Sequence, residues 1–173
     1  FPCCRPSGWA AGPTRGDPEG ISPEFTPFVT GTLATMANHG RRRNEVGDHH
    51  FISYSRFDAA KFAGQLYEAL LGASPPLTPW LDQRCIHPHL DWDEQVVEAI
   101  GTCDTMLFVV TRDSVQRQSV CKAEWWRALS YKKPVLLLLV HPDAEIPFRL
   151  ESRHRIDFTG EFVSDWRGMC AMS

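Results

Sequence analysis

The chain has 173 residues, 43% of them hydrophobic, and a formal net charge of −3 at pH 7. This length suits one domain with additional sequence better than two full domains. The small negative charge predicts neither a nucleic-acid partner nor an acidic tail. The longest apolar run, PVLLLLV at 134–140, is far shorter than the roughly 20 residues that a membrane-spanning helix needs. We therefore expect a globular protein with no nucleic-acid or membrane partner.

The first part of the chain differs in composition from the rest. Residues 1–47 are rich in Pro, Gly, Ser and Arg and show no apolar period, which predicts a disordered or non-native segment. RRR at 41–43 is a candidate basic patch, although such short patches are more typical of a solvated linker. The six cysteines are scattered and no secretory signal pattern is present, so we expect a reduced, cytoplasmic protein.

From residue 48 onward, short apolar runs alternate with helical periods. HHFISYS at 49–55 predicts a strand, and AAKFAGQLYEALL at 59–71 predicts a helix. Ser55 and Asp58 form an S-x-x-D pattern, which predicts the start of that helix.

Two further segments continue the alternation. LTPWLD at 77–82 predicts a short second strand, and its Pro79 places that strand at a sheet edge because proline cannot donate to a ladder. WDEQVVEAIGTC at 92–103 has apolar residues at helical spacing and predicts a second helix.

The second half of the chain contains three more predicted strands. TMLFVVT at 105–111 and PVLLLLV at 134–140 are continuous apolar runs, which are typical of central parallel strands covered on both faces. Residues 120–131 predict a helix between them, and RIDFT at 155–159 predicts a fifth strand. Residues 161–166 are expected to open a last helix.

Strands that alternate with helices predict βαβ units and a parallel sheet. Five strands in a domain of this size most often take the doubly wound order 2-1-3-4-5, in which ligands bind at the carboxyl ends of strands 1 and 3. Strand 1 ends at SYSRFD (53–58) and strand 3 ends at TRDS (111–114). We expect the functional site at this edge.

Glu124 is the carboxylate nearest to that edge on the helix at 120–131. The apolar residues that share one face of this helix are Cys121, Trp125, Ala128 and Leu129. Glu124 lies on the flank of this face and, if Ser119 is the cap, in the second turn, where the helix dipole contributes little. The helical pattern leaves two interpretations open, a solvated helix charge and a functional carboxylate.

The motifs from residue 48 to 160 resemble, in order, those of a Toll/interleukin-1 receptor (TIR) domain of the bacterial type. The matching stretches are FISYSRFD, WLD, I-x-P, W-x-x-x-V-x-x-A-I-x-x-C, FVVT-x-x-S, C-x-x-E-W, KKPVLLLLV and IDFT. The resemblance implies a flavodoxin-like α/β fold, a doubly wound five-stranded parallel sheet with helices on both faces. It places the TIR domain at 48–166, followed by a tail at 167–173.

The resemblance also implies an activity. In the TIR domains that are enzymes, the glutamate of the C-x-x-E motif is catalytic, and NAD+ is cleaved to nicotinamide and ADP-ribose or a cyclic form; here that residue is Glu124. One carboxylate suffices because nicotinamide leaves as a neutral base, so no general acid is needed. NAD+ is then the substrate, no cofactor is required, and the role is signalling or defence.

Other residues take supporting roles by the same resemblance. Ser53, Tyr54, Ser55 and Arg56 match the loop that lines the nucleotide site. Arg56 is a candidate partner of the pyrophosphate, although a surface arginine would fit its position equally well.

The W-x-D motif of the second strand supplies Trp80 and Asp82. We include both among the candidate substrate-binding residues, although Trp80 fits a core position and Asp82 a brace for the following loop.

The loop after the second strand, 83–95, matches one that reaches a neighbouring TIR protomer, with Ile86, Pro88 and Trp92 as its candidate assembly residues. Here His89 follows Pro88 where the family has glycine, and histidine resists the positive φ that glycine allows. Self-association or binding to other TIR domains is therefore an expectation that this departure weakens.

The same loop contains a candidate metal motif. Cys85, His87 and His89 form C-x-H-x-H, but the spacing fits no standard zinc site and no fourth ligand is evident, so we expect no metal.

Two other proteins with this strand order fit the sequence less well. A phosphorelay receiver would use Asp113, but it needs an acidic pair where this chain has Ser53 and Tyr54, and a lysine near Thr159. A flavodoxin needs a glycine-containing phosphate loop, and SYSRFD has no glycine. The stronger alternative is a non-catalytic TIR domain that acts only through protein–protein interaction in signal transduction.

Overall fold

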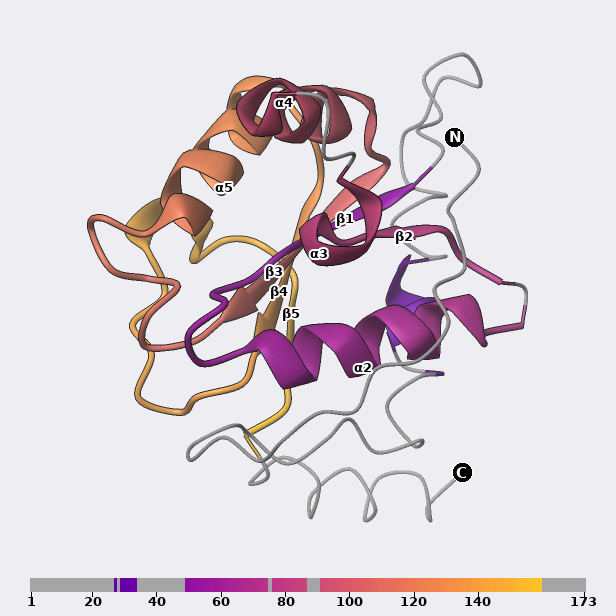
Figure 1. Cartoon of the computed structure of the whole chain (residues 1–173). Coiled ribbons are helices and arrows are strands. Elements are labelled where there is room, and N and C mark those ends of the chain that lie inside the picture. Colours follow the sequence, from indigo (N-terminus) through magenta and orange to yellow (C-terminus); the bar gives the residue numbers. More distant parts are fainter. Residues whose placement is uncertain (1–26, 28, 34–48, 75, 87–90, 160–173) are drawn as a thin grey trace, which may run out of the picture.

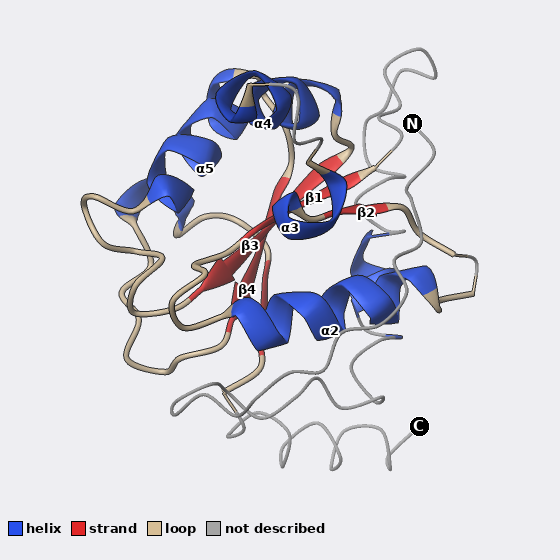
Figure 2. Ribbon diagram, in the orientation of Figure 1, coloured by secondary structure: helices blue, strands red, loops and turns tan. Residues whose placement is uncertain are grey.

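The chain forms a five-stranded parallel sheet between two layers of helices (Figures 1 and 2). The computed structural model describes residues 27, 29–33, 49–74, 76–86 and 91–159. The strands are β1 (His50–Ser53), β2 (Pro79–Trp80), β3 (Thr105–Val110), β4 (Val135–Leu139) and β5 (Arg155–Asp157). Their order is β2-β1-β3-β4-β5 and every pairing is parallel, which confirms the predicted topology. The strand with Pro79 lies at the edge, as predicted.

The helices divide between the two faces of the sheet. Helix α2 (Ala60–Leu71) covers one face, and α4 (Trp92–Thr102) and α5 (Val120–Ser130) cover the other (Figure 1). Two short elements after residue 48 were not predicted, the helix α3 (Asp82–Cys85) and the 3₁₀ helix η1 (Phe148–Leu150). A single turn is too short to show a hydrophobic period, so it leaves no pattern in the sequence.

The central strands bury side chains on both faces. In β3, Leu107 and Val109 pack on the side of α2, whereas Met106, Phe108 and Val110 pack on the side of α4 and α5. All five side chains are 0% exposed. The apolar runs in the sequence therefore reflect burial on both faces, as predicted.

The prediction that residues 1–47 lack structure is wrong for residues 29–33. These residues are helical, and Val29 and Leu33 are 1% and 2% exposed within the cluster that includes α2. The spacing of four residues puts both side chains on one helix face, but the polar and Pro-rich sequence around them masked this short pattern. The predicted basic patch at 41–43, the helix at 161–166 and the tail at 167–173 lie outside the described residues.

The start of α2 also differs from the prediction. Its N-cap is Ala59, which makes no side-chain cap. Ser55 instead donates to Asp113 at 2.6 Å, and Asp58 accepts from the Thr111 hydroxyl at 2.7 Å and from the Asp113 backbone N–H at 3.1 Å. The two predicted capping residues therefore fasten the loop after β1 to the loop after β3.

Within the described part of the chain, no helix has the length and apolar character needed to cross a membrane. The thiols of Cys103 and Cys121 are buried, and that of Cys85 is half-buried.

Candidate functional site

A cavity of about 650 Å³ opens at the carboxyl ends of β1 and β3. The loop after β1 contributes Tyr54, Ser55 and Arg56 to its walls, and α5 with the segment before it contributes Ser119, Cys121 and Glu124. This is the edge at which a doubly wound sheet binds ligands.

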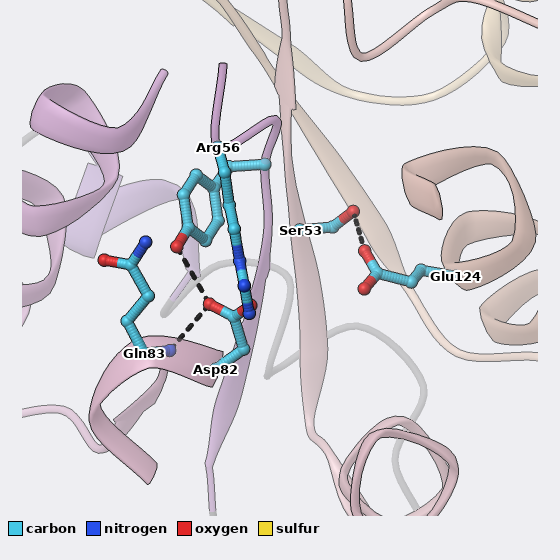
Figure 3. A network of polar contacts seen from close by, with 6 residues as sticks. Ser53, Arg56, Asp82, Gln83 and Glu124 are labelled. Atoms are coloured by element: carbon cyan, nitrogen blue, oxygen red, sulfur yellow. Dashed lines mark hydrogen bonds and ion pairs between the residues drawn. The ribbon is translucent and has the colours of Figure 1, made fainter. Parts of the chain in front are cut away.

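Glu124 points toward this cavity from the second turn of α5. Its Oε2 accepts a hydrogen bond from the Ser53 hydroxyl at 2.6 Å (Figure 3). Ser53 is 0% exposed and is the last residue of β1, so the strand end fixes the position of the carboxylate. Glu124 itself is only partly exposed. Of the two interpretations, the structure therefore excludes a freely solvated helix charge.

Burial perturbs the Glu124 carboxyl group. The loss of water raises the pKa of Glu124 to about 7, and the hydrogen bond from Ser53 offsets part of this rise. The nearby Asp82 carboxylate raises the pKa further, whereas Arg56 lowers it. Glu124 therefore changes its charge near neutral pH, which is characteristic of groups at functional sites.

The effect of Ser53 on the pKa of Glu124 can be tested without any assay of activity. We expect Ser53→Ala to raise the pKa of Glu124 above about 7, because the hydrogen bond that favours the carboxylate is lost. NMR titration of the Glu124 side-chain carboxyl carbon would measure this. A pKa in Ser53→Ala at or below that of the wild type would contradict the assigned hydrogen bond.

A second polar cluster forms the opposite wall of the cavity. Asp82 accepts from the Tyr54 hydroxyl at 2.8 Å, from Arg56 Nε at 2.9 Å and from the Gln83 backbone N–H at 2.7 Å (Figure 3). The Arg56 guanidinium also forms an ion pair with Asp82. Arg56 thus has a protein carboxylate as its partner in this structure, and Asp82 braces the start of α3, as the sequence suggested.

This cluster fixes the charge of its members. The pKa of Tyr54 is raised by burial and then by the Asp82 carboxylate, so its hydroxyl stays protonated. The pKa of Arg56 is raised by its hydrogen bond to Asp82, so the guanidinium stays protonated. Burial, and secondarily Glu124, raises the pKa of Cys121 to about 12, which keeps that thiol neutral and makes it a poor nucleophile.

The remaining predicted residues are distributed differently. Trp80 does not line the cavity; it stacks on Phe51 with ring centroids 4.7 Å apart, as a core residue would. Trp92, a predicted assembly residue, lines the cavity and is 37% exposed. Ile86 ends α3 as its C-cap, and Pro88 lies outside the described residues.

Asp113 belongs to this site, although its sequence context suggests only the phosphate acceptor of a receiver. Its carboxylate lines the cavity and accepts a hydrogen bond from Ser55. Its place just after β3 was the available signal, because β3 is adjacent to β1 at the reversal of the winding.

The candidate metal motif is only partly described. Cys85 ends α3, whereas His87 and His89 lie outside the described residues. Among the residues that are described, no group of three or more His, Cys, Asp or Glu side chains is placed to hold a metal ion.

Comparisons with known proteins agree with this fold. The chain resembles the crystal structure of the TIR domain of the Toll-related receptor TRR-2 from Hydra magnipapillata, with a TM-score of 0.58 and 20% sequence identity over 73% of this chain and 97% of that one. No curated protein sequence matches the chain. The family model for the TIR domain matches residues 51–169. This match, with the strand order described above, shows that the chain belongs to the TIR domain family.

Proposed function

We propose that this TIR domain hydrolyses NAD+ at the bond between nicotinamide and ribose, in signalling or defence. The observation that carries the proposal is the Glu124 carboxyl group, held at 2.6 Å by Ser53 inside a cavity at the reversal of the sheet winding. A carboxylate in this setting stabilises a developing positive charge more strongly than it would in water.

The chemistry needs few groups from the protein. The bond between ribose C1′ and the pyridinium nitrogen breaks, and its electron pair leaves with neutral nicotinamide. The positive charge moves to the ribose ring as an oxocarbenium ion, which the ionised Glu124 stabilises. Water then adds at C1′ and loses a proton, giving ADP-ribose; attack by an adenine nitrogen in place of water gives a cyclic product. With a pKa of about 7, Glu124 can accept the proton from water.

The cavity also fits the charge of the reacting end of the substrate. Asp82, Asp113 and Glu124 all line it, and the guanidinium of Arg56 is paired with Asp82. The cationic nicotinamide ring therefore meets an excess of carboxylates.

The direct test is the release of nicotinamide. We expect purified protein incubated with NAD+ to release nicotinamide and ADP-ribose or its cyclic form, with specific activity that increases with protein concentration. The increase follows if a second TIR domain completes the site, whose rim residue Trp92 is 37% exposed. Chromatography of the products over a wide range of protein concentrations measures the release of nicotinamide and the dependence of specific activity on concentration. A constant specific activity would exclude the dependence on assembly, and no nicotinamide at any concentration would exclude the reaction.

A second candidate function is a TIR domain that acts only by binding other TIR domains, as members of this family do. Two exposed phenylalanines favour it, since Phe57 and Phe148 are 87% and 85% exposed and large apolar side chains are costly to leave in water. Under this function, nicotinamide would not be released and the half-buried Glu124 would have no substrate.

A further inference from the structure

A second cavity of about 650 Å³ lies along the outer face of α5. We call it the basic groove and define it by Arg117, Lys122, Trp126, Arg127 and Tyr131. Gln118 and Ser119 line both this groove and the cavity that contains Glu124. The two cavities are therefore adjacent, on either side of the segment that leads into α5.

The adjacent cavities carry opposite charge. Three carboxylates line the first, which we call the acidic cavity, those of Asp82, Asp113 and Glu124. The basic groove is lined by three cationic side chains and by no carboxylate. A ligand that spans both would have to be positive at one end and negative at the other.

The cations of the groove are available to a ligand. Arg56, Arg84 and Arg112 each form an ion pair with a carboxylate. By contrast, across the ranges that the structure describes, the side chains of Arg117, Lys122 and Arg127 pair with no carboxylate. An anion that binds there would not have to displace a carboxylate of any residue described in the structure.

The groove also offers aromatic surface. Trp126 and Tyr131 are 47% and 46% exposed. The guanidinium of Arg149 lies 4.2 Å from the centroid of the Trp126 ring, which holds the indole in place. Cations beside exposed aromatic rings are the combination that binds phosphates together with a nucleobase.

We infer that the ADP half of NAD+ binds in the basic groove while its nicotinamide riboside half occupies the acidic cavity. The inference rests on the proposed function. NAD+ has the required charges, a cationic pyridinium at one end and two anionic phosphates toward the other. Arg117 and Lys122 face the phosphates, and Trp126 and Tyr131 contact the adenine. The groove thereby selects a dinucleotide over smaller nicotinamide ribosides.

The first test separates the two halves of the substrate. Lys122→Glu is expected to raise KM for NAD+ about tenfold with little change in kcat, because a phosphate contact becomes a repulsion. The same variant should cleave nicotinamide riboside, which has no phosphate, as fast as the wild type does. Lys61→Glu makes the same charge change at an exposed position of α2, on the other face of the sheet. It should leave the KM for NAD+ and the rate of nicotinamide riboside cleavage unchanged. An unchanged KM for NAD+ in Lys122→Glu would overturn the inference.

The second test does not depend on cleavage. ADP should bind the Glu124→Gln variant, as measured by calorimetry, and should bind about tenfold more weakly when Lys122→Glu or Trp126→Ala is added. ADP binding that depends on Lys122, in a wild-type protein that releases no nicotinamide, would support the groove and reject the proposed reaction. Cleavage of NAD+ without ADP binding to the groove would reject the inference alone. A Lys122→Glu variant that changes only the dependence of activity on protein concentration would also reject it, because the groove would then be an interface between copies.

Discussion

Glu124→Gln is expected to reduce NAD+ cleavage by about a thousandfold or more while the fold remains intact. Glutamine keeps the size of the side chain and can still accept a hydrogen bond from Ser53 Oγ, but it supplies no negative charge for the oxocarbenium ion. The loss should fall on kcat, because the charge develops only as the glycosidic bond breaks. Release of nicotinamide under saturating NAD+ measures the effect.

The matched control is Glu98→Gln, which makes the same chemical change at an exposed position of the neighbouring helix α4. It should cleave NAD+ at the wild-type rate, and both variants should retain the wild-type circular dichroism spectrum. Glu124→Gln with undiminished activity would show that this carboxylate takes no part in the reaction.

The same substitution is expected to stabilise the protein, by about 3 kcal/mol above pH 7. In the folded chain burial raises the pKa of Glu124 from 4.5 to about 7, so the folded state opposes ionisation that the unfolded chain allows. Below pH 4.5 the carboxyl group is largely protonated in both the folded and the unfolded chain, so the variant is no more stable than the wild type. Between pH 4.5 and 7 the unfolded chain loses its proton first, so wild-type stability falls relative to the variant as the pH rises. Above pH 7 the difference is complete.

Urea unfolding of wild type and Glu124→Gln at pH 4.5, 6 and 8 would measure this difference in the free energy of unfolding. Glu98→Gln should show no comparable increase with pH, because that side chain is exposed. A difference for Glu124→Gln that stays constant or shrinks as the pH rises would contradict a raised pKa. Joint loss of activity and gain of stability would identify Glu124 as a group held in an unfavourable setting for its function.

The sheet was predictable from the sequence because its central strands are buried on both faces. Residues 105–110 and 135–139 cannot form an amphipathic helix with a solvated side, so their apolar runs identify interior strands. The position of Glu124 near the edge of the sheet followed from the same topology, since α5 begins soon after β3.

Side-chain partners were less predictable, because they depend on distances between segments far apart in sequence. Arg56 and Asp82 are 26 residues apart, and nothing in either motif indicates that they pair. Ser55 and Asp58 matched a local capping pattern. Their side chains instead bond to residues in the loop after β3, which are 53 to 58 positions away in the sequence. Ser55 Oγ keeps one local bond, from the Phe57 backbone N–H at 3.1 Å, but neither side chain caps α2.

The hydrogen bonds between the loops after β1 and β3 also couple formation of the site to the pairing of these two strands. Ser55 and Asp58 hold Thr111 and Asp113, so the acidic cavity takes shape only after those two strands have paired. A ligand seated there should slow amide hydrogen exchange along the paired strands as well as in the loops, because opening the strands would release it.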